Sequence, residues 1–378
     1  MELRKIPPIK LYFPPGDIDQ IKVYVEEILT SGMLTLGEYT KAFEDEFGSF
    51  HQVKHSVAVN SGTSALEIAL RCLGIGNGDE VLVPTNTFSA TVASVFFAGG
   101  KPVLTDINPN TLCIDAEEIE KHLTSKTKAI IVVHIAGLVC PEMRIIGQMC
   151  EDHHVFLIED AAHAHGSKLS DQFAGSFGDA GCFSFYPTKV MTTGEGGMVT
   201  TNNDEIATKA KILRDQGKES FRSGKIVDLG YNWRMNEISA AIGLVQIRRL
   251  REIIEKRNKI ANYYDHELKK FNGIKPLSKT QNTIHNYYKY VTLLDQGMNR
   301  ERFKERLKAS GVGCGGEVYW PPIHLQPLYQ KLLGTRNRDF PIAEDVCSRM
   351  VALPIYPQMT MEEAEYVVQK IKKVLSNL

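Results

Sequence analysis

The sequence contains no apolar run long enough to cross a bilayer, so we expect no membrane-spanning helix and no membrane partner. Residues 1–8 lack the apolar core of a secretory signal peptide. Only seven cysteines are present, they are scattered, and none forms a C-x-x-C pair, a pattern that favours free buried thiols over a disulfide framework. These absences predict a cytoplasmic protein.

An excess of charge of either sign is also missing. The 44 Lys and Arg residues nearly balance the 45 Asp and Glu residues, and no basic tail or block of like charge occurs. Such a chain has no general electrostatic attraction to nucleic acid, so we expect no nucleic-acid partner. The histidine pairs at 153–154 and 163/165 lack acidic or cysteine partners at metal-ligand spacing, and we therefore expect no metal site.

Strand-like and helix-like segments alternate through the first two thirds of the chain. This alternation predicts an α/β fold with a mainly parallel central sheet between layers of helices. A long helical pattern at 236–268 leads into a mixed remainder, typical of a smaller C-terminal α+β domain. We place a large domain at 1–245 and a small one at 246–378, with residues 1–30 packing on the small domain. The expected strands lie at 80–83, 101–106, 128–134, 155–159 and 287–294, and the expected helices at 18–29, 88–98, 300–309 and 361–375.

One lysine stands out because of where it lies. Lys189 follows an apolar, strand-like run at 180–183 and precedes another at 198–201, so it sits in a short turn at the edge of a core. Lysine is rarely buried without a task or a partner. Partial burial lowers the pKa of an amine and makes it a nucleophile toward carbonyl groups.

Two other stretches give that lysine a context. Asp160 ends an apolar run at 155–159, where the carboxyl end of a parallel strand would place it beside a ligand. Residues 57–70 read as a strand, a small polar turn and a helix, whose free backbone N–H groups suit a phosphate. A lysine, a strand-end aspartate and a phosphate cup are what pyridoxal 5'-phosphate (PLP) needs.

The chain resembles the DegT/DnrJ/EryC1/StrS aminotransferases, fold-type-I enzymes that mostly aminate nucleotide-linked keto sugars. The resemblance runs nearly end to end, and its blocks occur in the family's order. They are LG at 36–37, AFE at 42–44, NSGTSAL at 60–66, GDEV at 78–81, EDAAHAHG at 159–166, GDAG at 178–181, the block around Lys189, GYNWRM at 230–235 and LPIYP at 353–357.

The resemblance implies a fold-type-I PLP transferase with a role for each matched residue. Lys189 would form the Schiff base with PLP and carry the proton, and Asp160 would hold the pyridine nitrogen protonated. The neighbouring Glu159 would point to the other face of the strand and be structural. The remaining cofactor contacts are Gly62, Thr63 and Ser184 at the phosphate, Phe88 stacked on the ring, His163 opposite it or near the phenolic oxygen, and Asn232 at the phosphate of a second subunit.

The family's substrate-side loop matches residues 319–327 less closely. Its recurrent histidine corresponds to His324, but Tyr319 and Trp320 stand where relatives usually carry His-Tyr, and Pro321 follows them. Trp320 could stack on a base, cover a sugar or belong to the core. This difference concerns the identity of the substrate and leaves the reaction unchanged.

The implied function is PLP-dependent transfer of an amino group from L-glutamate or L-glutamine to a keto sugar. The expected acceptor is a nucleotide-linked 3- or 4-keto-6-deoxy sugar, and the expected enzyme is a homodimer with shared active sites. A cyclitol or a small phosphorylated ketone is the alternative acceptor. A PLP-dependent sugar dehydratase is disfavoured because that branch carries histidine at the position of Lys189, and a DNA-binding regulator is disfavoured by the balanced charge.

Overall fold

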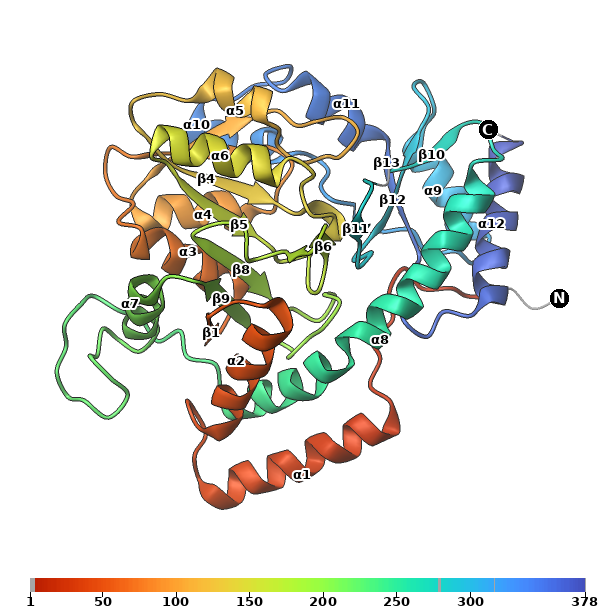
Figure 1. The fold of residues 1–378 in the computed structure, drawn as a ribbon. Helices are drawn as coiled ribbons and strands as arrows, with labels where there is room; N and C mark the ends of the chain where they lie inside the picture. The colour runs from red at the N-terminus through yellow and green to blue at the C-terminus, as the bar shows by residue number, and fades with distance from the viewer. Residues whose placement is uncertain (1–3, 278–279, 316, 378) are drawn as a thin grey trace.

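The computed structural model describes residues 4–277, 280–315 and 317–377. Within these residues the largest element is a seven-stranded sheet (Figure 1). Its strands, in spatial order, are β1 (His55–Val59), β9 (Gly197–Thr201), β8 (Ala180–Ser184), β5 (Phe156–Asp160), β4 (Thr127–Val133), β2 (Glu80–Pro84) and β3 (Lys101–Thr105). The pairs from β8 to β3 are parallel, whereas β9 pairs antiparallel with both of its neighbours. This arrangement is the mainly parallel sheet that the alternating pattern predicts.

Helices cover both faces of this sheet, and two separate apolar cores lie beneath them (Figure 1). The strands of the seven-stranded sheet are almost wholly buried. Their sequences are therefore continuous apolar runs rather than alternating apolar and polar residues. The helices of this part are α2 (Glu38–His51), α3 (Gly62–Cys72), α4 (Ser89–Ala98), α5 (Ala116–His122), α6 (Met143–His153) and α7 (Asp204–Arg214), with a short 3-10 turn, η1 (Ile135–Gly137).

The long helix α8 (Glu237–Leu268) runs from the large sheet to a smaller one (Figure 1). The smaller sheet is antiparallel and has the order β10 (Ile274–Pro276), β12 (Tyr290–Leu294) and β13 (Met350–Leu353). A third apolar core joins it to the second half of α8 and to two later helices. The remaining elements are α9 (Arg300–Ala309), η2 (Ile323–Leu325), α10 (Pro327–Leu333), α11 (Pro341–Arg349), α12 (Met361–Leu375) and a small sheet of β6 (Lys168–Leu169), β7 (Gln172–Phe173) and β11 (Thr283–Ile284).

The N-terminal segment contacts the third core before α1 (Pro15–Ser31) begins. Ile6 is buried in the third core, and its backbone N–H donates to the carbonyl of Gly311 at 2.8 Å. Further along, Asp17 pairs with Arg249 of α8 at 2.7 Å. The predicted boundary at residue 245 falls inside α8, which continues unbroken through it, so the two-domain division stays a proposal. Among the described residues, no helix combines the length and apolarity that a bilayer crossing requires.

Candidate active site

The ends of five strands meet around a cavity of about 420 Å³. Residues two or three positions after the ends of β1, β2 and β5 line it, together with the last residues of β4, β5 and β8. Carboxyl ends of parallel strands gather at one edge of a sheet, which is where open α/β folds bind ligands. Of the residues predicted from the sequence, the cavity brings together Gly62, Thr63, Phe88, Asp160, His163, Ser184, Lys189 and Tyr319.

Lys189 lies in the turn between β8 and β9, where its backbone N–H donates to the carbonyl of Tyr186 at 2.9 Å. Its amine faces the ring of Tyr288, with Nζ 4.8 Å from the ring centroid. Burial lowers the pKa of this amine from 10.5 to about 8, because desolvation disfavours the ammonium form; the charge of Lys289 lowers it further, and that of Asp160 opposes the shift. With this pKa, about a tenth of Lys189 is a free base at pH 7, far more than for an amine with the usual value of 10.5.

Asp160 is the last residue of β5 and is buried at the cavity floor. One carboxylate oxygen accepts the hydroxyl of Thr91 at 2.7 Å, and the other accepts the backbone N–H of Ala162 at 3.1 Å. Burial raises the pKa of this carboxyl group, and these two hydrogen bonds, together with the charge of Lys189, act against that rise. Thr91 has one hydroxyl proton, so while it donates to Asp160 it accepts from Thr87, 2.7 Å away.

The start of α3 forms a cup beside Ser184. Ser61 caps this helix by accepting the backbone N–H of Ser64 at 3.1 Å, while the N–H groups of Gly62 and Thr63 at the helix start have no acceptor within the helix. A Cβ atom on Gly62 would lie 2.7 Å from Cβ of Ser184, so only glycine lets the helix approach the end of β8 this closely. Free N–H groups, the helix dipole and neighbouring hydroxyls suit a phosphate.

His163 is buried with an incomplete set of partners. Its Nε2 lies 2.9 Å from the hydroxyl of Tyr319, and among the described residues Nδ1 has no hydrogen-bond partner. Burial holds the pKa of this imidazole well below its usual range, so the ring is neutral. A buried nitrogen without a partner beside an amine and a carboxylate fits a ligand with a polar group at that point, as PLP has.

Phe88 lines the cavity, whereas three other predicted residues, Trp320, Asn232 and His324, lie outside its lining. Phe88 is the N-cap of α4 rather than part of it, and its exposed ring lies 5.8 Å from that of Tyr319. Trp320 is partly exposed outside the cavity lining, with the Arg300 guanidinium 5.2 Å from its ring centroid. Asn232 is exposed and also lies outside this lining. Its predicted contact with a second subunit stays a prediction.

His324, predicted to contact substrate, is fully buried in η2 and lies outside the cavity lining. Its Nδ1 lies 2.7 Å from the hydroxyl of Thr85, and its Nε2 lies 3.1 Å from a carboxylate oxygen of Glu344. Both ring nitrogens are therefore engaged within the protein. This position favours a structural role that connects the end of β2 to α11, while a contact with substrate stays untested.

Glu159, next to Asp160, faces the opposite side of β5 and is fully buried. One of its carboxylate oxygens accepts the backbone N–H groups of Phe177 at 2.6 Å and Gly178 at 2.9 Å. The other accepts from Gly175 at 2.7 Å and from His134 Nε2 at 2.8 Å. The two adjacent carboxylates thus have different roles: Glu159 anchors a loop, whereas Asp160 faces the cavity.

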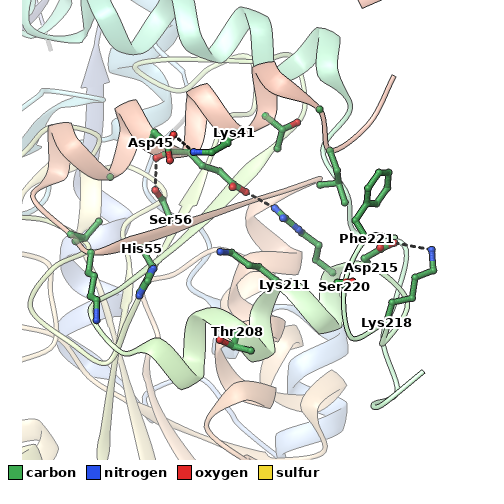
Figure 2. Close-up of a pocket in the computed structure, with 18 of the residues that line it drawn as sticks. Lys41, Asp45, His55, Ser56, Thr208, Lys211, Asp215, Lys218, Ser220 and Phe221 are labelled. Atoms are coloured by element: carbon green, nitrogen blue, oxygen red, sulfur yellow. Dashed lines mark hydrogen bonds and ion pairs between the residues drawn. The ribbon is translucent and has the colours of Figure 1, made fainter. Parts of the chain in front are cut away.

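A second hollow of about 590 Å³ lies between α2, β1 and α7, away from Lys189 (Figure 2). Several of its charged side chains are paired with one another: Lys41 bonds Asp45, and Lys218 lies 3.6 Å from Asp215. It is larger than the cavity at the strand ends, but its chemistry is that of a solvated, mixed-charge surface. We therefore place the active site in the smaller cavity.

Sequence reasoning missed two side chains of the cavity region. Thr91 lies in the first turn of α4, and Tyr288 lies two residues before β12, far from Asp160 and Lys189 in the sequence. Both reach the site only through the tertiary fold. A threonine on an apolar helix and a tyrosine among four aromatic or polar neighbours carry no signal of their own.

Comparison with known proteins identifies the wider group. Residues 16–372 match the model of the DegT/DnrJ/EryC1/StrS aminotransferase family. The GDP-perosamine synthase of Caulobacter vibrioides is 34% identical over 371 residues, which cover 98% of this chain and 99% of that protein.

Solved structures agree with the architecture. The structure of S. venezuelae DesV superposes with a TM-score of 0.92 at 29% identity and covers 98% of each chain. A candidate sugar aminotransferase from Streptococcus pneumoniae, solved in a PLP form, has a TM-score of 0.90 at 29% identity and covers 100% of this chain and 99% of that one. The fold is therefore that of the fold-type-I aminotransferases, as predicted.

Proposed function

The chain belongs to the DegT/DnrJ/EryC1/StrS aminotransferase family, whose cofactor is PLP, and from this premise we propose that it aminates a nucleotide-linked 3- or 4-keto-6-deoxy sugar. The proposed amino donor is L-glutamate or L-glutamine. The observation that carries the proposal is the cavity itself, where a lysine amine with a lowered pKa, a buried aspartate and a helix-start cup converge. The similarity to a GDP-perosamine synthase supports a nucleotide-linked sugar as acceptor.

When bound, PLP supplies an electron-accepting ring that stabilises negative charge on the carbon next to the transferred amine. We assign its covalent attachment to Lys189, because this amine lies in the cavity and gives up its proton easily. Asp160 would face the pyridine nitrogen, and the buried carboxylate would keep that nitrogen protonated. Gly62, Thr63 and Ser184 would hold the phosphate at the start of α3.

We assign Lys189 a second task, which is proton transfer. As a free base, its amine would take up the proton released from the α-carbon of the amino donor and would give it back when the acceptor is aminated. One positioned general base of this kind typically contributes ~10²–10⁴-fold in rate. The cavity walls, which include Tyr288 and Tyr319, keep bulk water away from that proton.

We also propose that the active unit is a homodimer in which Asn232 of one copy completes the phosphate site of the other. Asn232 is exposed, and the loop before it presents apolar side chains to solvent, most of all Leu229 at 86% exposure. Exposed apolar clusters of this kind mark interaction surfaces.

Mixing two inactive variants, Lys189→Arg and Asn232→Ala, tests the shared site. In a mixed dimer, one site would combine the intact Lys189 of one copy with the intact Asn232 of the other, so activity should return. No recovery of activity would contradict a shared site.

The substrate proposal is tested by incubating the PLP-loaded protein with L-glutamate and a panel of nucleotide-linked keto sugars. Mass spectrometry should detect an amino sugar and 2-oxoglutarate, and the Lys189→Arg variant should form neither. Reaction with glutamate but with no sugar of the panel would redirect the search to cyclitols and small phosphorylated ketones. Loss of a sugar hydroxyl without amination would instead identify a dehydratase.

A further inference from the structure

Tyr288 is a wall of the cavity that faces two of its functional groups. Its ring stacks on that of His163, with centroids 4.3 Å apart and planes inclined by 28°. Lys189 Nζ lies 4.8 Å from the same ring centroid. The Tyr288 hydroxyl lies 3.1 Å from the hydroxyl of Thr188, the residue directly before the lysine. One aromatic side chain thus contacts the lysine, its neighbour and the histidine.

The position of Tyr288 is determined by Asn286, which is fully buried. The Asn286 side-chain oxygen accepts the backbone N–H of Tyr288 at 2.9 Å. Its amide nitrogen donates to the carbonyls of His163 at 2.8 Å and His165 at 2.9 Å. A single side chain therefore ties the segment before β12 to the turn that follows β5, and this tie fixes the ring against His163.

We propose that Tyr288 is a positioning residue for Lys189: its ring face holds the lysine amine in the cavity and, with Lys289, determines how readily that amine gives up its proton. A cation within about 6 Å of an aromatic centroid is attracted to the ring face. The ring thus favours the ammonium form of Lys189. This inference rests on the proposed role of Lys189 in binding PLP. It concerns the lysine amine of the cofactor-free protein.

Lys289 acts on the same amine in the opposite direction. Its Nζ lies 5.0 Å from the centroid of the Tyr288 ring, so two ammonium groups share one aromatic side chain. Their repulsion disfavours the charged form of Lys189. Removing the Lys289 charge should therefore raise the pKa of Lys189, whereas removing the Tyr288 ring should lower it.

The other groups that face Lys189 have defined charge states. Asp160, at the end of β5, favours the ammonium form through its negative charge. His163 is neutral, because burial holds the pKa of its imidazole well below the usual range. Burial likewise raises the pKa of the Tyr288 and Tyr319 hydroxyls, so both stay uncharged. His163, Tyr288 and Tyr319 therefore stay uncharged around pH 8. Burial also lowers the pKa of Lys289, so the labelling follows the Lys289 amine together with that of Lys189.

The test measures the pKa of Lys189 directly in full-length, cofactor-free protein. Reductive methylation of the lysines over a range of pH, read peptide by peptide with mass spectrometry, reports the free-base fraction of each amine. Three variants are compared with the parent protein: Tyr288→Leu removes the ring, Tyr288→Phe removes only the hydroxyl, and Lys289→Met removes the second charge. Lys22, with 71% of its side chain exposed, serves as the internal standard.

We expect the pKa of Lys189 to fall by about 0.5–1 in Tyr288→Leu, which corresponds to a cation–π attraction of ordinary strength. It should stay within about 0.3 of the parent value in Tyr288→Phe, because the ring face remains. It should rise in Lys289→Met. A Lys189 pKa that is unchanged or higher in Tyr288→Leu overturns the role of the ring, and an unchanged value in Lys289→Met overturns the role of the second charge.

Two controls separate this inference from the proposed function. Far-UV circular dichroism at each pH shows whether a variant is folded. If Tyr288 had only a structural role, its replacement would change the stability of the protein without shifting the pKa of Lys189 in the predicted direction. Adding PLP before the labelling should protect Lys189 in the parent protein. Absence of that protection would contradict Lys189 as the attachment site and would leave the pKa comparison readable, because this comparison needs neither cofactor nor substrate.

Discussion

Replacing Glu159 by glutamine should destabilise the protein strongly although the change affects only one atom of the side chain. The carboxylate accepts from three backbone N–H groups and from His134, two donors on each oxygen. The glutamine side chain keeps one oxygen, and its NH₂ group would face two of these four donors without being able to accept from them. Hydrogen bonds to a charged acceptor contribute ~1.5–3 kcal/mol each, and losing two of them lowers the free energy of unfolding by about 3–6 kcal/mol.

Asp160→Asn is the matched control, since the same chemical change is made one residue away on the opposite face of β5. Among the described residues, Asp160 accepts from Thr91 and Ala162 alone, and the Thr91 hydroxyl can rotate to accept instead. The stability cost should stay below about 1 kcal/mol, while aminotransferase activity is lost. Urea unfolding of the cofactor-free proteins, followed by circular dichroism, compares the two. The reasoning is refuted if Glu159→Gln is as stable as the parent, or if Asp160→Asn is equally destabilised.

Three further predictions concern the cavity. The rate at which PLP attaches to Lys189 should rise with pH around a midpoint of about 8, because only the free base reacts; stopped-flow absorbance would show a midpoint near 10.5 if the amine were not desolvated. Thr91→Val removes a donor to Asp160, should raise the pKa of that carboxyl group and should lower kcat/KM at least about tenfold; an unchanged value excludes this support. Gly62→Ala should weaken PLP binding by about tenfold, since the added Cβ would collide with Ser184, and an absorbance titration measures it.

Local sequence patterns were sufficient for the elements that place the chemistry. The strand expected at 155–159 is β5 (Phe156–Asp160), and the helix expected from 236 to 268 is α8 (Glu237–Leu268). Both follow from apolar periodicity and from capping, as when Asn236 accepts the backbone N–H of Ser239. The helix expected at 88–98 begins at Ser89, so Phe88 is its cap and is exposed to the cavity rather than part of a helical core.

Tertiary contacts decided what the sequence could not show. Nothing local marks Asn286 and Tyr288 as neighbours of His163, because the contact joins the segment before β12 to the turn after β5. His324 illustrates the converse, because the family resemblance suggests a substrate contact while the fold surrounds the ring with Thr85 and Glu344. A histidine has the same appearance in a sequence whether it faces a ligand or completes a buried network.

The most direct test of the account is the visible absorbance spectrum of the purified, PLP-treated protein before and after L-glutamate is added. We predict a yellow band that depends on Lys189, is missing in Lys189→Arg, and is bleached by glutamate as the amino group is transferred to the cofactor. A protein that stays colourless with PLP would contradict the proposed site. A band that is equally strong in Lys189→Arg would contradict the assignment of the lysine.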